Sequence, residues 1–197
     1  MRHLLVLPVV LAACAPAPTL APDAAFHLTL SDRLCGETLT GAVVSTQPDD
    51  ADWQGKTLTL GPVMCASSTD ASDGEDGVVS AMVMPLAVGE DTSRTWTLLH
   101  GDQLEFRHMH FEPDGTPSAV TLYGGVAAPG GTATQQSFPA DAATKANFTA
   151  NGIARSNPNI WTLTLDEDAN TLTYALARPA TDTAPARDFR AEFSLPE

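Results

Sequence analysis

Two histidines separated by a single residue are the side chains of this sequence best placed to do chemistry. In an extended strand, residues i and i+2 point to the same side, so His108 and His110 could offer two imidazoles to one metal ion. Leu104 and Phe106 share that face. If these apolar side chains face the core, both histidines point inward, where an unpaired imidazole needs a ligand or a hydrogen-bond partner. If Met109 faces the core instead, both histidines are exposed.

A metal ion at this pair would need a third ligand, which His27, His100 or a carboxylate would have to provide. With such a site the protein would be a metal-dependent enzyme or a metal carrier. The sequence contains no G-x-S-x-G nucleophile elbow and no lysine-containing phosphate loop. We therefore assign no catalytic residue, and we expect no cofactor apart from the metal of this alternative.

The strands that would carry these residues are visible as short segments of alternating apolar and polar residues, separated by Gly, Pro, Asn and Asp. We expect a mostly β fold, a single antiparallel β-sandwich or barrel of about eight strands. One short helix is expected after Asp141, a residue suited to an N-cap. The expected strands are 56–60, 78–84, 94–99, 104–111, 118–123, 159–165, 171–177 and 189–195.

Within this scheme, the segments 159–165 and 171–177 should pair as a hairpin with their large apolar residues facing the core. Residues 46–53 and 124–136 are expected to be loops. Tyr123 and the glycines after it, together with residues 135–141, would form either the rim of a pocket beside His108 or a cap that plugs one end of a barrel. We prefer the cap.

The first fourteen residues indicate where the protein is delivered. Arg2 is followed by an apolar run over residues 4–13, which is shorter than the roughly 20 apolar residues needed to span a bilayer and is typical of a signal-peptide core. The tetrapeptide Leu11-Ala12-Ala13-Cys14 resembles the lipobox of bacterial lipoproteins. This resemblance implies that a signal peptide, residues 1–13, is removed and that Cys14 is acylated, with a diacylglyceryl thioether and an amino-terminal acyl chain such as palmitate.

The same resemblance implies attachment to a membrane of the bacterial cell envelope. Ala15, rather than aspartate, follows the cysteine, which implies export to the outer membrane, facing the periplasm. Residues 15–25 contain three prolines and no apolar period, so we expect residues 14–25 to be the lipidated cysteine and an extended tether. Residues 26–197 are then a single β domain.

Two cysteines remain after Cys14 has been acylated. An even number of cysteines in an oxidising compartment favours a disulfide between Cys35 and Cys65. The alternative is a pair of free, buried thiols.

The charge balance excludes one class of partner. Ten lysines and arginines stand against 24 aspartates and glutamates, giving a formal net charge of −14. Such a chain is repelled by nucleic-acid phosphates, so we expect no nucleic-acid partner.

These observations favour a lipid-anchored envelope protein whose β domain is not catalytic and either binds an envelope protein or small ligand or has a structural role. One alternative is the metal-dependent envelope enzyme or metal carrier built on His108 and His110. The other is a lipocalin-like carrier of a small ligand, which requires an open barrel interior. A barrel filled completely by side chains would exclude that carrier.

Overall fold

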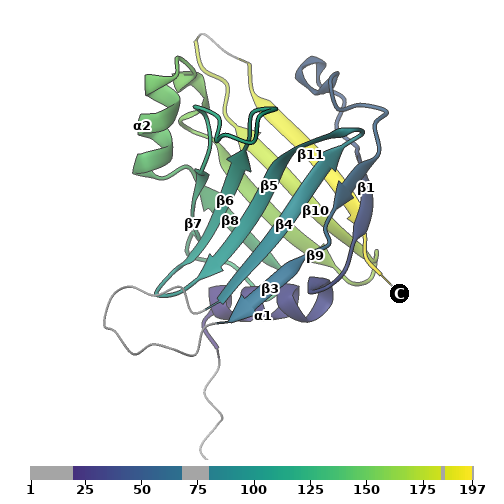
Figure 1. Ribbon diagram of the computed structural model, residues 1–197. Helices are drawn as coiled ribbons and strands as arrows, with labels where there is room; N and C mark the ends of the chain where they lie inside the picture. Colours follow the sequence, from purple (N-terminus) through teal and green to yellow (C-terminus); the bar gives the residue numbers. More distant parts are fainter. Residues whose placement is uncertain (1–19, 68–79, 183–184, 197) are drawn as a thin grey trace, which may run out of the picture.

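The chain folds into an antiparallel sheet that curls back on itself as a barrel (Figure 1). The structure is a computed structural model that describes residues 20–67, 80–182 and 185–196. In these ranges eleven strands form one sheet, in the order β7-β6-β5-β4-β2-β1-β11-β10-β9-β8, with β3 paired to β4. The strands are β1 (Leu39–Val43), β2 (Leu58–Leu60), β3 (Met64–Ser67), β4 (Ser80–Val88), β5 (Asp91–His100), β6 (Leu104–His110), β7 (Tyr123–Val126), β8 (Gln135–Pro139), β9 (Ile160–Asp166), β10 (Thr171–Arg178) and β11 (Arg187–Ser194).

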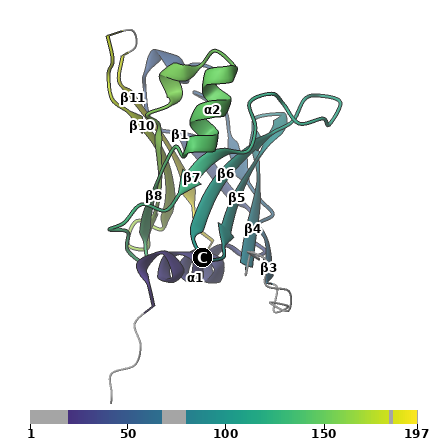
Figure 2. The ribbon, with the colours of Figure 1, turned by 90° about the vertical axis from the view of Figure 1, so that its left-hand side faces the viewer.

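Helical segments lie at both ends of this barrel. In the described part of the chain they are α1 (Pro22–Leu34), α2 (Ala142–Ala150) and the 3-10 turns η1 (Pro48–Asp50) and η2 (Ala154–Ser156). Figure 2 shows α1 beneath the barrel and α2 toward the opposite end. No helix within the described ranges is long and apolar enough to cross a membrane.

The barrel is nearly closed where β7 meets β8, the two strands at the ends of the pairing order. The amide of Ala128 donates to the carbonyl oxygen of Ser137 at 2.8 Å, immediately after β7. Gly125 permits this close approach, because a Cβ at its position would lie 1.8 Å from the carbonyl oxygen of Pro139. Near-closure leaves little unpaired edge on these two strands.

Helix α1 plugs one end of the barrel with an apolar stripe. Phe26, Leu30 and Leu34 are spaced by four residues, so they share one face of the helix, and each is at most 1% exposed. The ring of Phe26 lies 6.5 Å from that of Phe138 in β8, measured between centroids. Immediately after the helix, Cys35 forms the expected disulfide with Cys65 in β3, with Cα atoms 5.6 Å apart.

Helix α1 corrects the expected extended tether. Residues 22–25 belong to the helix, and the β domain expected from residue 26 begins in the middle of it. Proline density suggested an extended chain, but Pro22 lies in the first helical turn, where its missing N–H costs no hydrogen bond. Residues 1–13, Cys14 and the tether up to residue 19 lie outside the described residues.

The mostly β, antiparallel fold is confirmed, but the strand number is larger than the expected eight. Seven of the expected segments contain strands, whereas residues 118–122 lie outside any strand. The unexpected strands β1, β3, β7 and β8 have only four or five residues each, and part of the expected loop 124–136 belongs to β7 and β8. Strands this short show too little alternation to be distinguished from loops. Likewise, two α-helices replace the single one expected.

The expected hairpin between β9 and β10 is confirmed. The cross-strand pairs are Trp161 with Leu176, Leu163 with Tyr174, and Leu165 with Leu172.

The expected helix after Asp141 is also confirmed, as α2. The carboxylate of Asp141 accepts a hydrogen bond from the amide of Thr144 at 2.8 Å and caps the helix. Its second oxygen forms an ion pair with Arg107 on the outer face of β6 at 2.5 Å. The cap and the ion pair together fix the start of α2 against the barrel wall.

Candidate functional site

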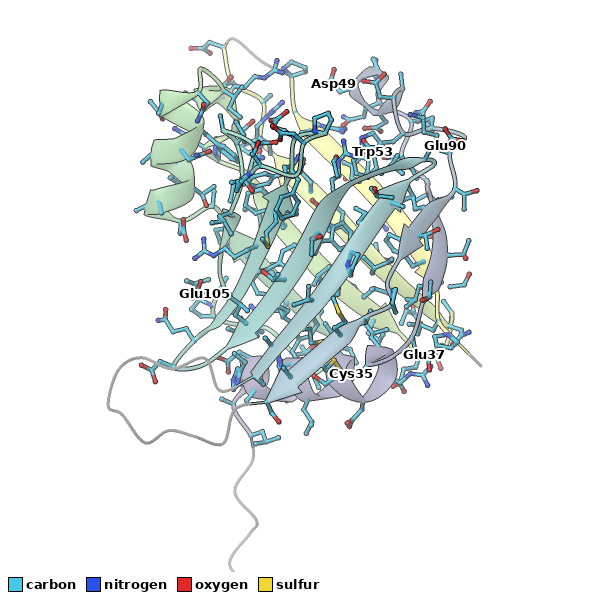
Figure 3. All side chains as sticks on the ribbon, in the orientation of Figure 1. Cys35, Glu37, Asp49, Trp53, Glu90 and Glu105 are labelled. Carbon is cyan, nitrogen blue, oxygen red and sulfur yellow. A yellow bond between two sulfur atoms is a disulfide. The ribbon has the colours of Figure 1, made fainter. Side chains whose placement is uncertain are left out.

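The end of the barrel away from α1 contains a cavity of about 410 Å³, here called the barrel cavity. All three tryptophans of the chain line it. Figure 3 shows one of them, Trp53, at this end of the molecule, whereas Cys35 lies at the other end beside α1. The volume is in the range of small-molecule sites. The lining residues are Trp53, Arg94, Trp96, His108, His110, Val120, Tyr123, Phe148, Ile153, Ser156, Asn159, Trp161, Tyr174, Leu176, Arg187 and Phe189.

Strand register arranges this lining in two levels. Across the β5–β6 pair, Arg94 lies opposite His110, and one level further in Trp96 lies opposite His108. The outer level is therefore polar and the inner level mostly aromatic. We call the outer level, at the opening, the mouth; its residues are Trp53, Arg94, His110, Asn159 and Arg187.

His108 is held through both of its ring nitrogens. Its Nδ1 lies 3.2 Å from the carbonyl oxygen of Tyr123, and its Nε2 lies 3.0 Å from the hydroxyl of Tyr174. Burial lowers the pKa of His108 to about 3, so the ring is neutral at physiological pH. Because a carbonyl oxygen can only accept, Nδ1 carries the proton and the Tyr174 hydroxyl donates to Nε2.

His110 forms a second histidine–tyrosine pair, nearer the mouth. The hydroxyl of Tyr123 lies 3.1 Å from Nε2 of His110. Burial, and then the nearby charge of Arg94, lower the pKa of His110. Burial raises the pKa of Tyr123 to about 12. The cavity wall thus offers neutral imidazoles and phenols as hydrogen-bonding groups.

Positive charge at the mouth comes from Arg94 and Arg187. Arg187 forms an ion pair with Asp50, whose side chain is fully buried, and Arg94 forms one with Asp91, which is partly exposed. Neither aspartate lines the cavity. The guanidinium of Arg94 lies over the Trp53 ring, 5.1 Å from its centroid. The two cations therefore face the cavity while their carboxylate partners do not.

One polar atom at the mouth has no partner among the described residues. Asn159 is 6% exposed, and its Oδ1 is buried without a hydrogen bond. The backbone holds the residue firmly, because its amide donates to the carbonyl oxygen of Ser156 and its own carbonyl accepts from Ala140. A buried amide oxygen without a donor costs about 1–3 kcal/mol. Because this oxygen is enclosed by protein atoms rather than open to the cavity, we assign it no contact with a ligand.

His108 and His110, the two histidines considered as metal ligands, both point into the barrel and line the cavity. The histidines considered as a third ligand lie elsewhere. His27 in α1 and His100 at the end of β5 stack on each other, with centroids 5.2 Å apart. His100 is four residues along β5 from Trp96, the partner of His108, which corresponds to about 13 Å. Within the described ranges, no three metal-ligating side chains are grouped together. The structure thus uses the pair for hydrogen bonds to tyrosines.

The segments expected to plug the barrel belong mostly to strands β7 and β8 of its wall instead. Tyr123 lines the cavity beside His108, as the pocket-rim alternative had it, and Gly125 lies at the closure of the barrel. The plug is α1, at the opposite end.

Four mouth residues belong to no sequence motif: Trp53, Arg94, Asn159 and Arg187. A signal does exist for the arginines, since each lies two residues before a buried aromatic residue of the same strand, Trp96 or Phe189. Residues two apart in a strand lie on the same face, so an arginine at this spacing from a buried aromatic residue is expected to point toward the barrel interior. Trp53 and Asn159 lie outside strands, where no such periodicity applies.

The fold and cavity together define a nearly closed antiparallel β-barrel, plugged by a helix at one end and hollow at the other. No family model, curated protein or solved structure matches the chain. The functional inferences that follow therefore rest on the residues of this chain.

Proposed function

We propose that this protein is a lipid-anchored protein of the bacterial cell envelope whose β-barrel binds a small molecule, as a carrier or receptor rather than a catalyst. The observation that carries this proposal is the barrel cavity. A small barrel can fill its interior with side chains, and here α1 and the apolar residues beside it fill only one end. A concave, mainly aromatic pocket with a few inward polar groups is the usual form of a small-ligand site.

The non-catalytic part of the proposal rests on His108. A general base needs a free lone pair, whereas Nε2 of His108 already accepts the hydroxyl proton of Tyr174. The aromatic rings around it are positioned to pack against a ligand rather than to transfer protons.

The envelope location rests on the lipobox-like sequence that ends at Cys14. Acyl chains on this residue would exceed the two-signal requirement for stable membrane anchoring. The disulfide between Cys35 and Cys65 agrees with folding in an oxidising compartment.

Ligand binding is tested by native mass spectrometry of the protein purified from its own envelope. We expect a co-purifying small molecule, and we expect Val120→Phe, which adds a ring to the cavity wall, to abolish it. Val44→Phe is the matched control, because Val44 is 46% exposed and lies outside the cavity. Failure to recover any small molecule, together with no binding in a screen of small organic compounds, would reject the binding function.

The anchor is tested separately with Cys14→Ser, which removes the thiol that would be acylated. We expect the wild-type protein to incorporate labelled palmitate and to sediment with membranes, and the variant to do neither. If neither protein incorporates labelled palmitate and both distribute equally between the membrane and soluble fractions, the anchor is rejected. The ligand-binding proposal would remain intact.

A further inference from the structure

The charged side chains described in the lining of the barrel cavity are all of one sign. Among the residues that the structure describes, the lining contains Arg94 and Arg187 and neither aspartate nor glutamate, although the chain has 24 acidic residues and a net charge of −14. The charge of Arg94 also reaches the cavity wall: after burial, it is the larger influence on the low pKa of His110, and it outweighs the opposing effect of Asp91. The mouth thus presents guanidinium groups to the cavity, while the carboxylates that pair with them, Asp50 and Asp91, lie outside its lining.

A second group of arginines adds to this charge beside β11. Arg178 lies directly opposite Arg187 in the β10–β11 ladder and is only 7% exposed. Burial lowers the pKa of Arg178, and the like charges of Arg155 and Arg187 lower it further. The charge of Asp49 offsets part of this repulsion. Arg178 lies outside the cavity lining, so direct contact with a ligand falls to Arg94 and Arg187.

The inner level of the cavity fits an apolar ring. Trp96 and Tyr174 stack with centroids 4.4 Å apart, and the Trp161 ring lies 5.1 Å from that of His108. The cavity volume of about 410 Å³ lies within the range of small-molecule sites. That is enough for one aromatic ring with a short side chain.

We infer that the ligand of the barrel cavity is a small aromatic carboxylic acid, with its carboxylate at the mouth beside Arg94 and Arg187 and its ring among the inner aromatic residues. This inference rests on the proposed ligand-binding function. Guanidinium groups bind carboxylates through charge-assisted hydrogen bonds, which are the stronger class.

Three probes separate these features on one protein. They are two aromatic acids, 3-phenyllactate and 3-phenylpropionate, and the neutral amide of 3-phenyllactate. Because all three tryptophans line the cavity, quenching of intrinsic fluorescence reports its occupancy directly. The full-length chain with Cys14→Ser serves for the titrations, since it avoids detergent.

We expect each acid to bind about tenfold or more tightly than the amide. Arg94→Met should weaken binding of 3-phenyllactate about tenfold and change binding of the amide by less than about twofold. Arg190→Met is the matched control, because Arg190 is exposed on β11 outside the cavity. Asp91, the partner of Arg94, is 46% exposed and stays solvated in Arg94→Met, so this variant should fold.

Equal binding of 3-phenyllactate and its amide would overturn the inferred ligand class and leave the proposed binding function standing. If none of the three probes quenches the fluorescence at millimolar concentration, the inferred ligand class is overturned. The proposed binding function would still be decided by native mass spectrometry of the protein purified from the envelope. The probe comparison uses unaltered cavity residues, so it remains decisive even if a cavity variant fails to fold.

Discussion

The hydroxyl of Tyr174 donates a hydrogen bond to Nε2 of His108, with 3.0 Å between the two atoms, inside the aromatic half of the barrel. The two residues come from β10 and β6, which are far apart in the sheet order, so the bond spans the barrel interior. His108 is 3% exposed and Tyr174 is 7% exposed. This hydrogen bond forms only when the barrel brings β6 and β10 face to face and when Nε2 of His108 is unprotonated.

Removing the hydroxyl of Tyr174 should destabilise the protein. In Tyr174→Phe, Nε2 of His108 loses its donor at a buried position, and we expect the free energy of unfolding to fall by about 1–3 kcal/mol. Urea denaturation followed by circular dichroism measures this loss. Tyr123→Phe is the control, because its hydroxyl bonds to the partly exposed His110, and its cost should stay below about 1 kcal/mol. A cost for Tyr174→Phe no larger than that of the control would contradict the assigned bond.

Stability should also fall in mild acid because of His108. Burial lowers its pKa in the folded state to about 3, whereas in the unfolded chain it is about 6.5. The unfolded chain therefore binds more protons between pH 6.5 and 3, and stability drops as the pH falls through this window. At pH 5 the loss from this residue should be about 2 kcal/mol.

The variant His108→Gln isolates this contribution. Glutamine keeps one donor for the Tyr123 carbonyl and one acceptor for the Tyr174 hydroxyl, but it does not titrate. Urea denaturation between pH 7 and 4.5 should show a shallower decline for the variant than for the wild type. Parallel declines in the two proteins would mean that His108 is not buried as a neutral ring.

The disulfide should contribute strongly to stability. Cys35 and Cys65 are separated by 30 residues, and the chain-entropy estimate for such a loop is about 3 to 4 kcal/mol. The bond also fastens the end of α1, which plugs the barrel. Thermal unfolding of the Cys35→Ser/Cys65→Ser double variant should therefore show a clear loss, and dithiothreitol should reproduce it in the wild type. A reductant effect that persists in the double variant would point to another cause.

Regular strands and well-capped helices could be predicted from the sequence because their signals are local. β9 and β10 alternate without interruption, and Asp141 lies where a cap is needed. β7 carries no such signal: Gly124 and Gly125 have no side chains to alternate, and their extended state depends on pairing with β6 and contact with β8. Helix α1 was missed for a related reason, since Pro22 is compatible with both a tether and a first helical turn.

The site was less predictable than the fold, because it depends on which strands face one another across the barrel. The pair His108 and His110 indicated an inward-facing polar position, but the sequence could not supply their partners. Trp96 and Tyr174 stack at 4.4 Å although they belong to β5 and β10. Contacts of this kind arise only when the sheet closes, and no local pattern of residues encodes them.

Barrel closure itself can be tested at Gly125. A methyl group there would meet the carbonyl oxygen of Pro139 at 1.8 Å, and because that atom is backbone, β7 and β8 would have to separate. We expect Gly125→Ala to lower the free energy of unfolding by about 3 kcal/mol and to raise hydrogen exchange of the β7 and β8 amides. Gly115→Ala is the control: it has a positive φ but open space around it, so only backbone strain of about 1–2 kcal/mol applies and β7–β8 exchange should not change. Unchanged β7–β8 protection in Gly125→Ala would show that the barrel does not close through this contact.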